Sequence, residues 1–514
     1  MLGERRWQAV ADTAVDDPGG APAVSWSPWR DPVAWTIAGL VFCAYFTISL
    51  YRLLTLTPTS WDLGIYTEYV KQLSLLRAPI VDVRGPGFNL LGDHFQIGLA
   101  VLAPFFRLYP SPATLLFFQA LLTAVSVFPI MSAASLLLGR ASSRLIGFAY
   151  GFSWGLQQMI DFDFHEIALA VPLLAFSLSA LVRGRVRAAA VWALPLVFVK
   201  EDQGFTVAAI GAYLVFDGIA AAAGPGSRLA PARQRGSVGW GALLVLWGLF
   251  WSVFAITVII PHFNPLHEYY YWKDGGVVAG GHGFSVGSLI GQTAAGWPTK
   301  LQTVVLLLLP TAFAALGSPV ALLALPSLLL RFVSTNTAYW GTNWHYNATM
   351  VPILFIAAAE AMARWRAAGA NRPRAGLAVG LRRGLARHGA PMMAAIAVAL
   401  AFQFPLSTLW HGSTFAISPQ VAADNAAMAV VPDGATVQTT LNLLAPLAAR
   451  TDTFWIGNAG NPLTQYIVFD GRNSGYSPAP GNVPAFIAGL YPAAGYTPVF
   501  ERGDVYVFRR GQLR

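Results

Sequence analysis

Long apolar runs separated by short polar segments dominate the sequence from residue 33 to residue 410. A helix needs about 20 mainly apolar residues to cross a bilayer, and many of the runs approach that length. The pattern therefore predicts a multi-span α-helical membrane protein with about 11–13 transmembrane helices. The predicted spans cover roughly residues 33–56, 112–138, 145–160, 166–182, 186–200, 203–222, 238–260, 301–316, 318–331, 347–363 and 388–410.

The tail of the chain has a different pattern. Short β-rich runs, namely TVQTT, TFWIG, YIVFD and VYVFRR, alternate there with Pro, Gly and Asn. Runs of this length bounded by turn residues are typical of strands. We therefore expect residues 411–514 to form a small α/β domain after a membrane domain at residues 31–410. Residues 1–30 contain no apolar h-region and are expected to form a polar tail.

The composition excludes an ordinary soluble enzyme. Hydrophobic residues make up 55% of the chain and charged residues only 11%, with a mean hydropathy of +0.53. A soluble domain has about a quarter of its residues charged. The net charge of +9 does not indicate a nucleic-acid partner, because the arginines form short clusters between apolar runs, as in cytoplasmic loops. The single cysteine, Cys43, rules out an internal disulfide framework.

The arginine clusters predict the topology. They lie within residues 140–144, 183–187, 228–235 and 364–387. If all four clusters are cytoplasmic, the protein spans a bacterial cytoplasmic membrane with its N-terminus on the cytoplasmic side. Loops 57–95 and 261–300 and the C-terminal domain are then on the outer side. Residues 95–110 are apolar, but a full crossing there would invert every later segment. We expect residues 95–110 to form a half-inserted or interfacial element.

Under this topology the acids and histidines gather on the outer side of the membrane. The candidate residues are Asp62, Asp93, His94, Asp161, Asp163, His165, Glu166, Lys200, Glu201, Asp202, Arg331, His345 and Tyr346. An ionisable residue near bilayer depth is costly and is by default a functional hypothesis. Plain structural roles remain open: Asp62 as a helix cap, Lys200 in a self-neutralising turn, His165 with Glu166 in a solvated turn, and His345 in an aromatic belt.

Carboxylates, histidines and cations at the outer surface suit a reaction on an anionic lipid-linked donor. Arg or Lys binds the phosphate, and a carboxylate takes a proton from an incoming hydroxyl. The D-x-D spacing of Asp161 and Asp163 also suits a divalent cation such as Mg or Mn.

The order of these segments resembles the GT-C superfamily of membrane glycosyltransferases, which use polyprenyl-phosphate-linked sugars. One span is followed by a long outer loop with an early acid (SWDLGIYTEYV), a second outer turn with paired acids (DFDFHE), a many-span body and an outer C-terminal domain. The strings WDLGIY, GDHF, APFFRLYPSPATLLFFQAL, DFHE, VKEDQG and HYNATMVP are also similar to a bacterial membrane family known only as a domain of unknown function. That similarity covers roughly residues 55–360.

The resemblance implies a glycosyltransferase that moves a sugar from a polyprenyl-phosphate donor to a glycan or lipid acceptor of the cell envelope. A single dedicated base would suit an inverting reaction. Asp62 matches the catalytic carboxylate of the first outer loop, and Asp161 and Asp163 match acids that bind metal or acceptor in the second. Arg331 and Lys200 are candidates for the donor phosphate on charge and position alone. The glycine-rich loop 261–300 would form a mobile flap. Histidines here, such as His94 and His165, depart from the GT-C pattern.

Two other functions remain open at this stage. A lipid or anion transporter, or flippase, would use the acids and histidines as a proton relay. Such a protein should show inverted repeats with broken spans, and the sequence shows neither clearly. A non-catalytic envelope-assembly protein would instead use its outer domain to bind a cell-wall polymer.

Overall fold

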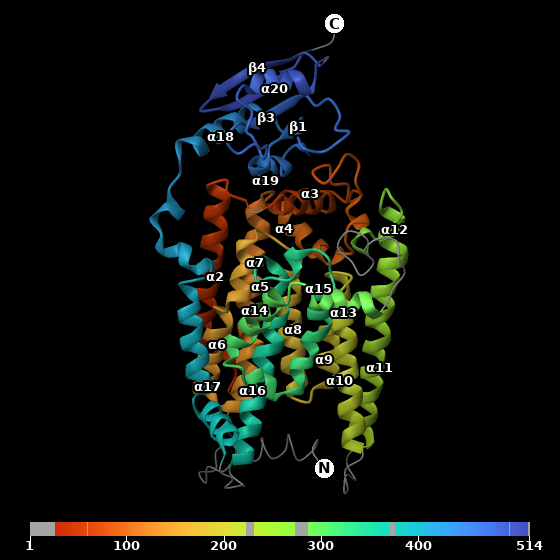
Figure 1. Ribbon diagram of the computed structural model, residues 1–514, viewed down its shortest axis with the longest axis vertical. Coiled ribbons are helices and arrows are strands. Elements are labelled where there is room, and N and C mark those ends of the chain that lie inside the picture. Colours follow the sequence, from red (N-terminus) through yellow and green to blue (C-terminus); the bar gives the residue numbers. More distant parts are fainter. Residues whose placement is uncertain are drawn as a thin grey trace.

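The computed structural model describes residues 26–58, 60–222, 231–272, 286–369, 376–492 and 494–511. In this part of the chain a bundle of helices carries a small sheet domain at one end (Figure 1). The N-terminal residues 1–25 lie outside the described residues. So do residues 273–285, which contain the glycines of the predicted flap.

Six helices of the described chain are long and apolar enough to cross a membrane. They cover Pro32–Leu54, Pro112–Leu138, Gln203–Ala220, Gly236–Phe263, His345–Ala368 and Leu377–Ala401. Shorter apolar helices join them at Ile97–Leu108, Ile167–Val182, Val186–Phe198 and Pro319–Phe332. The multi-span α-helical fold is confirmed, while the count of about 11–13 spans stays a prediction.

The bundle is built from helices joined by short turns, several of which are 3₁₀ segments. Its helices are α2 (Pro32–Leu54), α5 (Pro112–Leu138), α6 (Arg140–Gly151), α7 (Trp154–Asp161), α8 (Ile167–Val182), α9 (Val186–Ala193), α10 (Gln203–Ala222), α11 (Pro231–Phe254), α12 (Ile260–Phe263), α13 (Val286–Ala294), α14 (Trp297–Leu308), α15 (Leu325–Phe332), α16 (Met350–Gly369) and α17 (Leu377–Ala401). Two short helices, α3 (Asp62–Ser74) and α4 (Ala103–Leu108), lie at the end of the bundle below the sheet domain (Figure 1).

Three predicted spans were wrong in their bounds. The run 145–160 forms two helices, α6 and α7, with a break at Phe152 and Ser153. The run 301–316 stops being α-helical at Leu308, because Pro310 has no backbone N–H to donate and Ala312 and Phe313 adopt left-handed φ values of 49° and 59°. The run 388–410 starts early, at residue 377, because arginines form its first turns, and its helix ends at residue 401.

The described helix ends that carry the predicted arginine clusters share one end of the bundle, opposite the sheet domain. Arg144 donates to Asp31 before α2, with an Nη2–Oδ1 distance of 2.9 Å. Arg366 near the end of α16 donates to the carbonyl of Leu138 at the end of α5, at 3.0 Å. The start of α11 and the end of α16 reach the same end of the molecule (Figure 1). This shared end agrees with the sequence pattern, and its cytoplasmic side stays a prediction.

Residues 95–110 form two short pieces, the 3₁₀ helix η3 (Ile97–Leu102) and α4. Twelve helical residues extend about 20 Å, which is less than the roughly 30 Å of a bilayer core. Their buried side chains, including Leu99 and Phe106, pack with those of α3. The segment is therefore a surface element at the end of the bundle, as the interfacial interpretation requires.

The C-terminal domain is a five-stranded sheet with helices on both faces. Its strands are β1 (Thr436–Thr439), β2 (Asp452–Trp455), β3 (Tyr466–Asp470), β4 (Tyr496–Arg502) and β5 (Val505–Arg510), and its helices are α18 (Pro419–Val430), α19 (Leu444–Ala448) and α20 (Val483–Leu490). The strand order is β2-β1-β3-β5-β4, with β1, β2 and β3 parallel and β5 antiparallel to β3 and β4. Alternate residues of β3 face opposite helices: Val468 packs with α18 and α19, and Phe469 packs with α20. The predicted α/β domain is confirmed.

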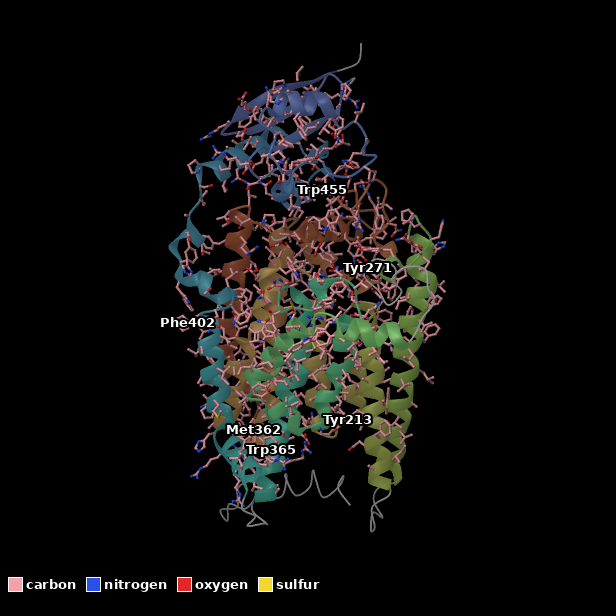
Figure 2. All side chains as sticks on the ribbon, viewed as in Figure 1. Tyr213, Tyr271, Met362, Trp365, Phe402 and Trp455 are labelled. Carbon is pink, nitrogen blue, oxygen red and sulfur yellow. The ribbon has the colours of Figure 1, made fainter. Side chains whose placement is uncertain are left out.

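The domain sits on α3. A Cβ added to Gly64 would lie only 3.0 Å from the Cβ of Leu444 in α19, so a glycine here permits close approach of the two helices. The Trp61 and Trp455 rings meet edge to face with centroids 5.1 Å apart. Trp455 lies on the bundle-facing side of the domain, above Tyr271 (Figure 2). Helix α3 is thus held from above by the domain and from below by the bundle.

Candidate functional site

The DFDFHE turn between α7 and α8 is held in place by one amide side chain. Gln119 of α5 donates from Nε2 to the carbonyl of Asp163 and accepts the backbone N–H of His165 at 3.0 Å. Asp163 adopts a left-handed φ of 70°, which reverses the chain there. Glu166 then precedes the first turn of α8. The turn therefore presents its acids and histidine in a fixed arrangement.

Glu166 is the centre of the polar cluster. Its carboxylate is fully buried and lies 3.1 Å from Nζ of Lys200 and 2.7 Å from Nδ1 of His165. The Tyr66 hydroxyl of α3 donates to the same carboxylate. A buried charge needs a counter-charge and hydrogen bonds, and here Lys200 supplies the counter-charge and Tyr66 a hydrogen bond. The structure thus brings together Glu166, His165 and Lys200, three of the predicted site residues.

A second buried acid, Glu201, holds the GDHF segment. Its Oε1 lies 2.7 Å from Nδ1 of His94 and accepts from the Tyr269 hydroxyl at 3.1 Å. Its Oε2 accepts the backbone N–H of Phe95 at 3.1 Å. Lys200 therefore pairs with Glu166 rather than with its neighbours in the sequence, so the self-neutralising interpretation of the KEDQ turn is wrong.

Asp93 is held by residues of two other loops. The Tyr271 hydroxyl donates to it at 3.1 Å, and Nε of Arg84 lies 3.5 Å away. The Tyr271 ring also stacks on His94, with centroids 4.6 Å apart. Tyr269, Tyr271 and Arg84 were not among the predicted site residues.

The predicted residues Arg331, His345 and Tyr346 close the other side of the site. The His345 ring stacks on His165, with centroids 3.3 Å apart. Arg331 donates to the carbonyls of Tyr339 and Gly341, each at 2.8 Å. It also donates to the carbonyl of Tyr346 at 3.4 Å and to the Asn347 side chain at 2.8 Å. Most of its N–H groups are thus used to hold the loop at 339–347.

These groups surround a cavity of about 170 Å³. Of the predicted residues, those that line it are His94, Lys200, Glu201, Asp202, Arg331, His345 and Tyr346. Asp202 is half-buried there and accepts from Gln203 at 3.2 Å. The apolar side chains of Ile167, Phe205, Ile256 and Leu330 complete the wall. Two cations beside an apolar wall suit a ligand that has both a phosphate and a hydrocarbon part.

Asp62 does not line this cavity, but the charge of Lys200, which does, acts on its carboxylate. It is the first residue of α3, and its backbone N–H is bound by Oγ of Ser60 at 3.0 Å. None of the described backbone N–H groups donates to its carboxylate, so the capping role left open for Asp62 is not seen there. Burial, followed by the nearby charges of Glu166, Asp163 and Asp93, raises the pKa of Asp62 to about 7, and Lys200 opposes the shift.

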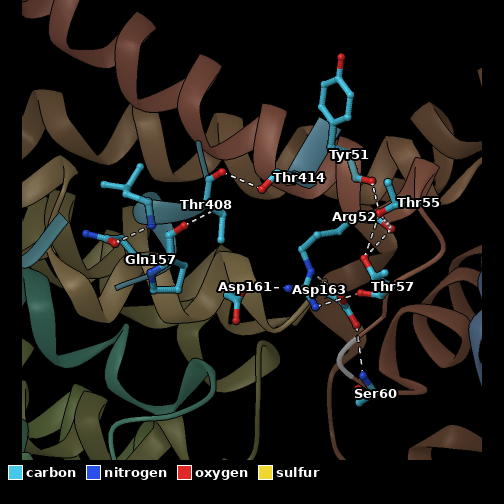
Figure 3. A network of polar contacts seen from close by, with 12 residues as sticks. Tyr51, Arg52, Thr55, Thr57, Ser60, Gln157, Asp161, Asp163, Thr408 and Thr414 are labelled. Carbon is cyan, nitrogen blue, oxygen red and sulfur yellow. Dashed lines mark hydrogen bonds and ion pairs between the residues drawn. The ribbon is translucent and has the colours of Figure 1, made fainter. Parts of the chain in front are cut away.

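Asp161 and Asp163 share one arginine that the sequence analysis did not select. Nη1 of Arg52, in the last turn of α2, lies 2.8 Å from Asp161, and its Nε lies 3.6 Å from Asp163 (Figure 3). Asp163 also accepts the backbone N–H of Ser60 at 3.3 Å. Arg52 could have been noticed as a lone cation at the end of the first predicted span, far from the four clusters. It joins α2 to the turn that carries Glu166.

A second, open cavity of about 330 Å³ lies on the Arg52 side. Its polar lining residues are Arg52, Thr55, Thr57, Asp161, Thr408, Ser413, Thr414 and Ser418. Several of these hydroxyls donate to nearby main-chain carbonyls, as Thr408 does to Pro405 and Thr414 to Thr408, both at 2.7 Å (Figure 3). Their oxygens then remain as acceptors, and the cavity suits a ligand that has many O–H donors.

The predicted metal ligands do not gather in one place. Among the described residues, no group of three or more His, Cys, Asp and Glu is positioned to hold a metal ion. Asp161 and Asp163 face the Arg52 guanidinium, which already supplies positive charge. The metal therefore stays a prediction.

Comparison with family models identifies the chain. A model described as a predicted membrane protein, DUF2079, matches residues 52–477. The chain belongs to this family. The match covers the chain from the end of α2 to β3 of the sheet domain. Among curated proteins, none matches the chain.

Solved structures show the fold to which this DUF2079 protein is similar. ArnT from Cupriavidus metallidurans bound to undecaprenyl phosphate matches with a TM-score of 0.51 and 13% identity, covering 91% of this chain and 97% of ArnT. The apo form of the same protein matches with a TM-score of 0.45 and 14% identity, over 92% and 98% of the two chains. The match confirms the fold expected from the sequence as an ArnT-like fold.

We expect Glu166→Gln to destabilise the DUF2079 protein strongly. The substitution leaves the Lys200 ammonium without its counter-ion at a buried position, which costs roughly 3–5 kcal/mol. Thermal unfolding of the purified protein in detergent measures the loss. The double variant Glu166→Gln with Lys200→Met removes both charges and should recover much of the stability. A double variant no more stable than Glu166→Gln alone would contradict the ion pair.

Proposed function

We propose that this DUF2079 protein transfers a sugar from a polyprenyl-phosphate donor to a hydroxyl of an envelope acceptor. One observation carries the proposal: α3, which begins at Asp62, is bonded through Tyr66 to Glu166, and Glu166 pairs with Lys200 in the wall of the cavity. Burial and the neighbouring acids raise the pKa of Asp62 to about 7. The likeness to ArnT bound to undecaprenyl phosphate supports a donor of that class. The arginine clusters support a site on the outer face, because positive loops stay in the cytoplasm.

In this mechanism the donor phosphate lies in the 170 Å³ cavity. Lys200 has N–H groups left over after its pairing with Glu166 and contributes most to binding the phosphate. Arg331 contributes mainly positive charge, because most of its N–H groups are already bonded. The apolar wall receives the first part of the lipid chain.

Asp62 is the general base. It takes the proton of the acceptor hydroxyl as the acceptor oxygen bonds to the anomeric carbon, and the bond from that carbon to the phosphate oxygen breaks. The polyprenyl phosphate leaves with the electron pair of that bond, and a single attack inverts the anomeric centre. A base with a pKa near the working pH is half-ionised and still basic enough to accept the proton.

We place the acceptor in the hydroxyl-lined cavity. Arg52 lines this cavity and also pairs with Asp163. The charge of Asp163 in turn acts on the carboxylate of Asp62. The acceptor-rich lining of Thr, Ser and Asp side chains suits the many hydroxyls of a sugar. In this proposal Asp62 receives the proton from an acceptor that reaches from this cavity toward the phosphate site.

We expect Asp62→Asn to reduce transfer by roughly 10²- to 10⁴-fold, because an amide cannot accept the proton. The measurement is release of undecaprenyl phosphate from a panel of undecaprenyl-phosphate-linked sugars, followed by mass spectrometry. In the unsubstituted protein, kcat/KM should rise about tenfold per pH unit below pH 7 and level off above it, since the protonated acid is inactive.

Asp82→Asn, in the same outer loop, is the matched control and should keep the original rate and pH profile. The general-base mechanism is wrong if purified Asp62→Asn turns over like the original protein. A transporter would also show itself in this experiment, by moving the lipid between leaflets of a vesicle without releasing undecaprenyl phosphate.

The metal expectation is tested with a chelator. If Arg52 supplies the positive charge at Asp161 and Asp163, EDTA should leave transfer within about twofold of the untreated rate, because guanidinium–carboxylate pairs need no metal. A complete loss of transfer that is restored by Mn or Mg would instead assign a divalent ion to the reaction.

The acceptor site predicts a selective effect of Thr408→Val with Thr414→Val. These changes keep the shape of the two side chains and remove two hydroxyl oxygens, so the KM for the acceptor should rise roughly tenfold while the KM for the donor stays the same. Thr257→Val is the control, because its hydroxyl bonds the carbonyl of Val253 at 2.7 Å outside both cavities. An equal rise in both KM values would argue against this placement.

A further inference from the structure

A third cavity, of about 480 Å³, lies between the membrane-side helices and the sheet domain. The end of α3, the end of α4 and the start of β2 form its walls. Four cations line it, Lys71, Arg77, Arg107 and Arg450, against a single carboxylate, Asp452. This excess of positive charge is far from the four arginine clusters and belongs to neither cavity of the proposed reaction.

Two of the cations are fixed parts of the wall. Lys71 donates from Nζ to the carbonyl of Thr451 at 2.7 Å, which ties α3 to β2. Arg450 donates to the carbonyl of Val431 at 2.7 Å and pairs with Asp433 at 2.8 Å. Both side chains are therefore held at the cavity by contacts within the protein.

The other two cations are available to a ligand. Arg107 is exposed and uses one nitrogen, Nη1, to donate to the carbonyl of Ser74 at 3.1 Å. Arg77 is exposed, and its guanidinium bonds to no other described residue. Guanidinium groups with free N–H pairs bind phosphate oxygens in a bidentate way. The mouth of the cavity thus presents two unsatisfied phosphate-binding groups.

An exposed apolar stripe lies beside this mouth. It consists of the exposed side chains of Ile97, Val101, Phe105 and Leu108 along the η3–α4 element, and Leu108 is 83% exposed. Leu76, next to Arg77, is 96% exposed. A stripe of this kind on a surface element next to transmembrane helices belongs in the headgroup and upper acyl region of a bilayer.

We propose that this cavity binds the phosphate of an anionic phospholipid from the leaflet on the side of the sheet domain. Arg77 and Arg107 contact the phosphate from the membrane-side helices, Arg450 adds charge from the domain, and the acyl chains lie on the apolar stripe. Basic residues beside a lipid-facing apolar surface favour anionic over zwitterionic headgroups. Bound lipid would bridge α3 and the domain at the point where Lys71 already joins them.

This site is separate from the proposed reaction. Lys71 follows Asp62 by nine residues, which is about 14 Å along the α3 axis and half a turn around it. The inference rests on the cavity, its charges and the stripe, so it holds whether or not Asp62 is a catalytic base.

The test uses the full-length protein in neutral detergent, titrated with phosphatidylglycerol and separately with phosphatidylcholine, with bound lipid counted by native mass spectrometry. The original protein should bind one phosphatidylglycerol about tenfold or more tightly than phosphatidylcholine. Arg77→Gln with Arg107→Gln should lose that preference, whereas Arg77→Lys with Arg107→Lys should keep most of it. The matched control, Arg140→Gln with Arg187→Gln, removes the same charge at the opposite end and should leave this lipid bound.

An unchanged preference in Arg77→Gln with Arg107→Gln would overturn the proposal, as would an equal loss in the control pair. Release of the lipid by inorganic phosphate would assign the site to a free anion instead. Displacement by undecaprenyl phosphate at equal concentration would assign it to the sugar donor. Sugar transfer by the glutamine variants in detergent should remain, which separates this outcome from a failure of the proposed reaction.

Discussion

The buried carboxylate of Glu166 is the constraint on which the site depends. A charge removed from water must be compensated, and here the compensation comes from Lys200 before α10, Tyr66 of α3 and His165 of the preceding turn. Those groups come from three separate segments of the chain. Satisfying one acid therefore fixes the relative positions of a surface helix and two turns between bundle helices. Asp62 follows from this arrangement, because it is four residues before Tyr66 and lies on the same face of α3.

The same arrangement gives neighbouring acids different properties. Glu166 and Glu201 have buried cationic or hydrogen-bonding partners, so their negative charge is stabilised inside the protein. Asp62 stands among these charges without a described donor to its carboxylate, and its pKa rises to about 7. Two carboxylates with different environments can then have different roles, one as a fixed counter-ion and the other as a proton acceptor. Under the proposed function, Asp62 is the acid that accepts a proton, and Glu166 helps to hold α3 in place through Tyr66.

The sequence predicts those features of the fold that depend on composition and on the lengths of apolar and β-rich runs. Apolar length predicted the bundle, short β-rich runs predicted the sheet domain, and the arginine clusters predicted which residues share an end. The gathering of His94, His165, Lys200, Glu201 and His345 around one region also follows from placing the acids and histidines on one side. The hydrogen-bond partners that come from distant parts of the sequence could not be predicted. Tyr66 and Gln119 look like ordinary helix residues, and only the folded contacts give them their roles.

Helix α3 connects the sheet domain to the candidate site, because it contacts both. The first turn of α3 carries Asp62, and Gly64 lets α19 approach so closely that a methyl group there would meet Leu444. Below, Tyr66 bonds to Glu166, and at the far end Lys71 bonds to Thr451. A thirteen-residue amphipathic helix would have little stability alone in water, so its place is set by these contacts. The position of Asp62 therefore depends on contacts with the sheet domain as well as on contacts with the bundle. A ligand that strengthened the contact between α3 and the domain at Lys71 would also restrict the movement of Asp62.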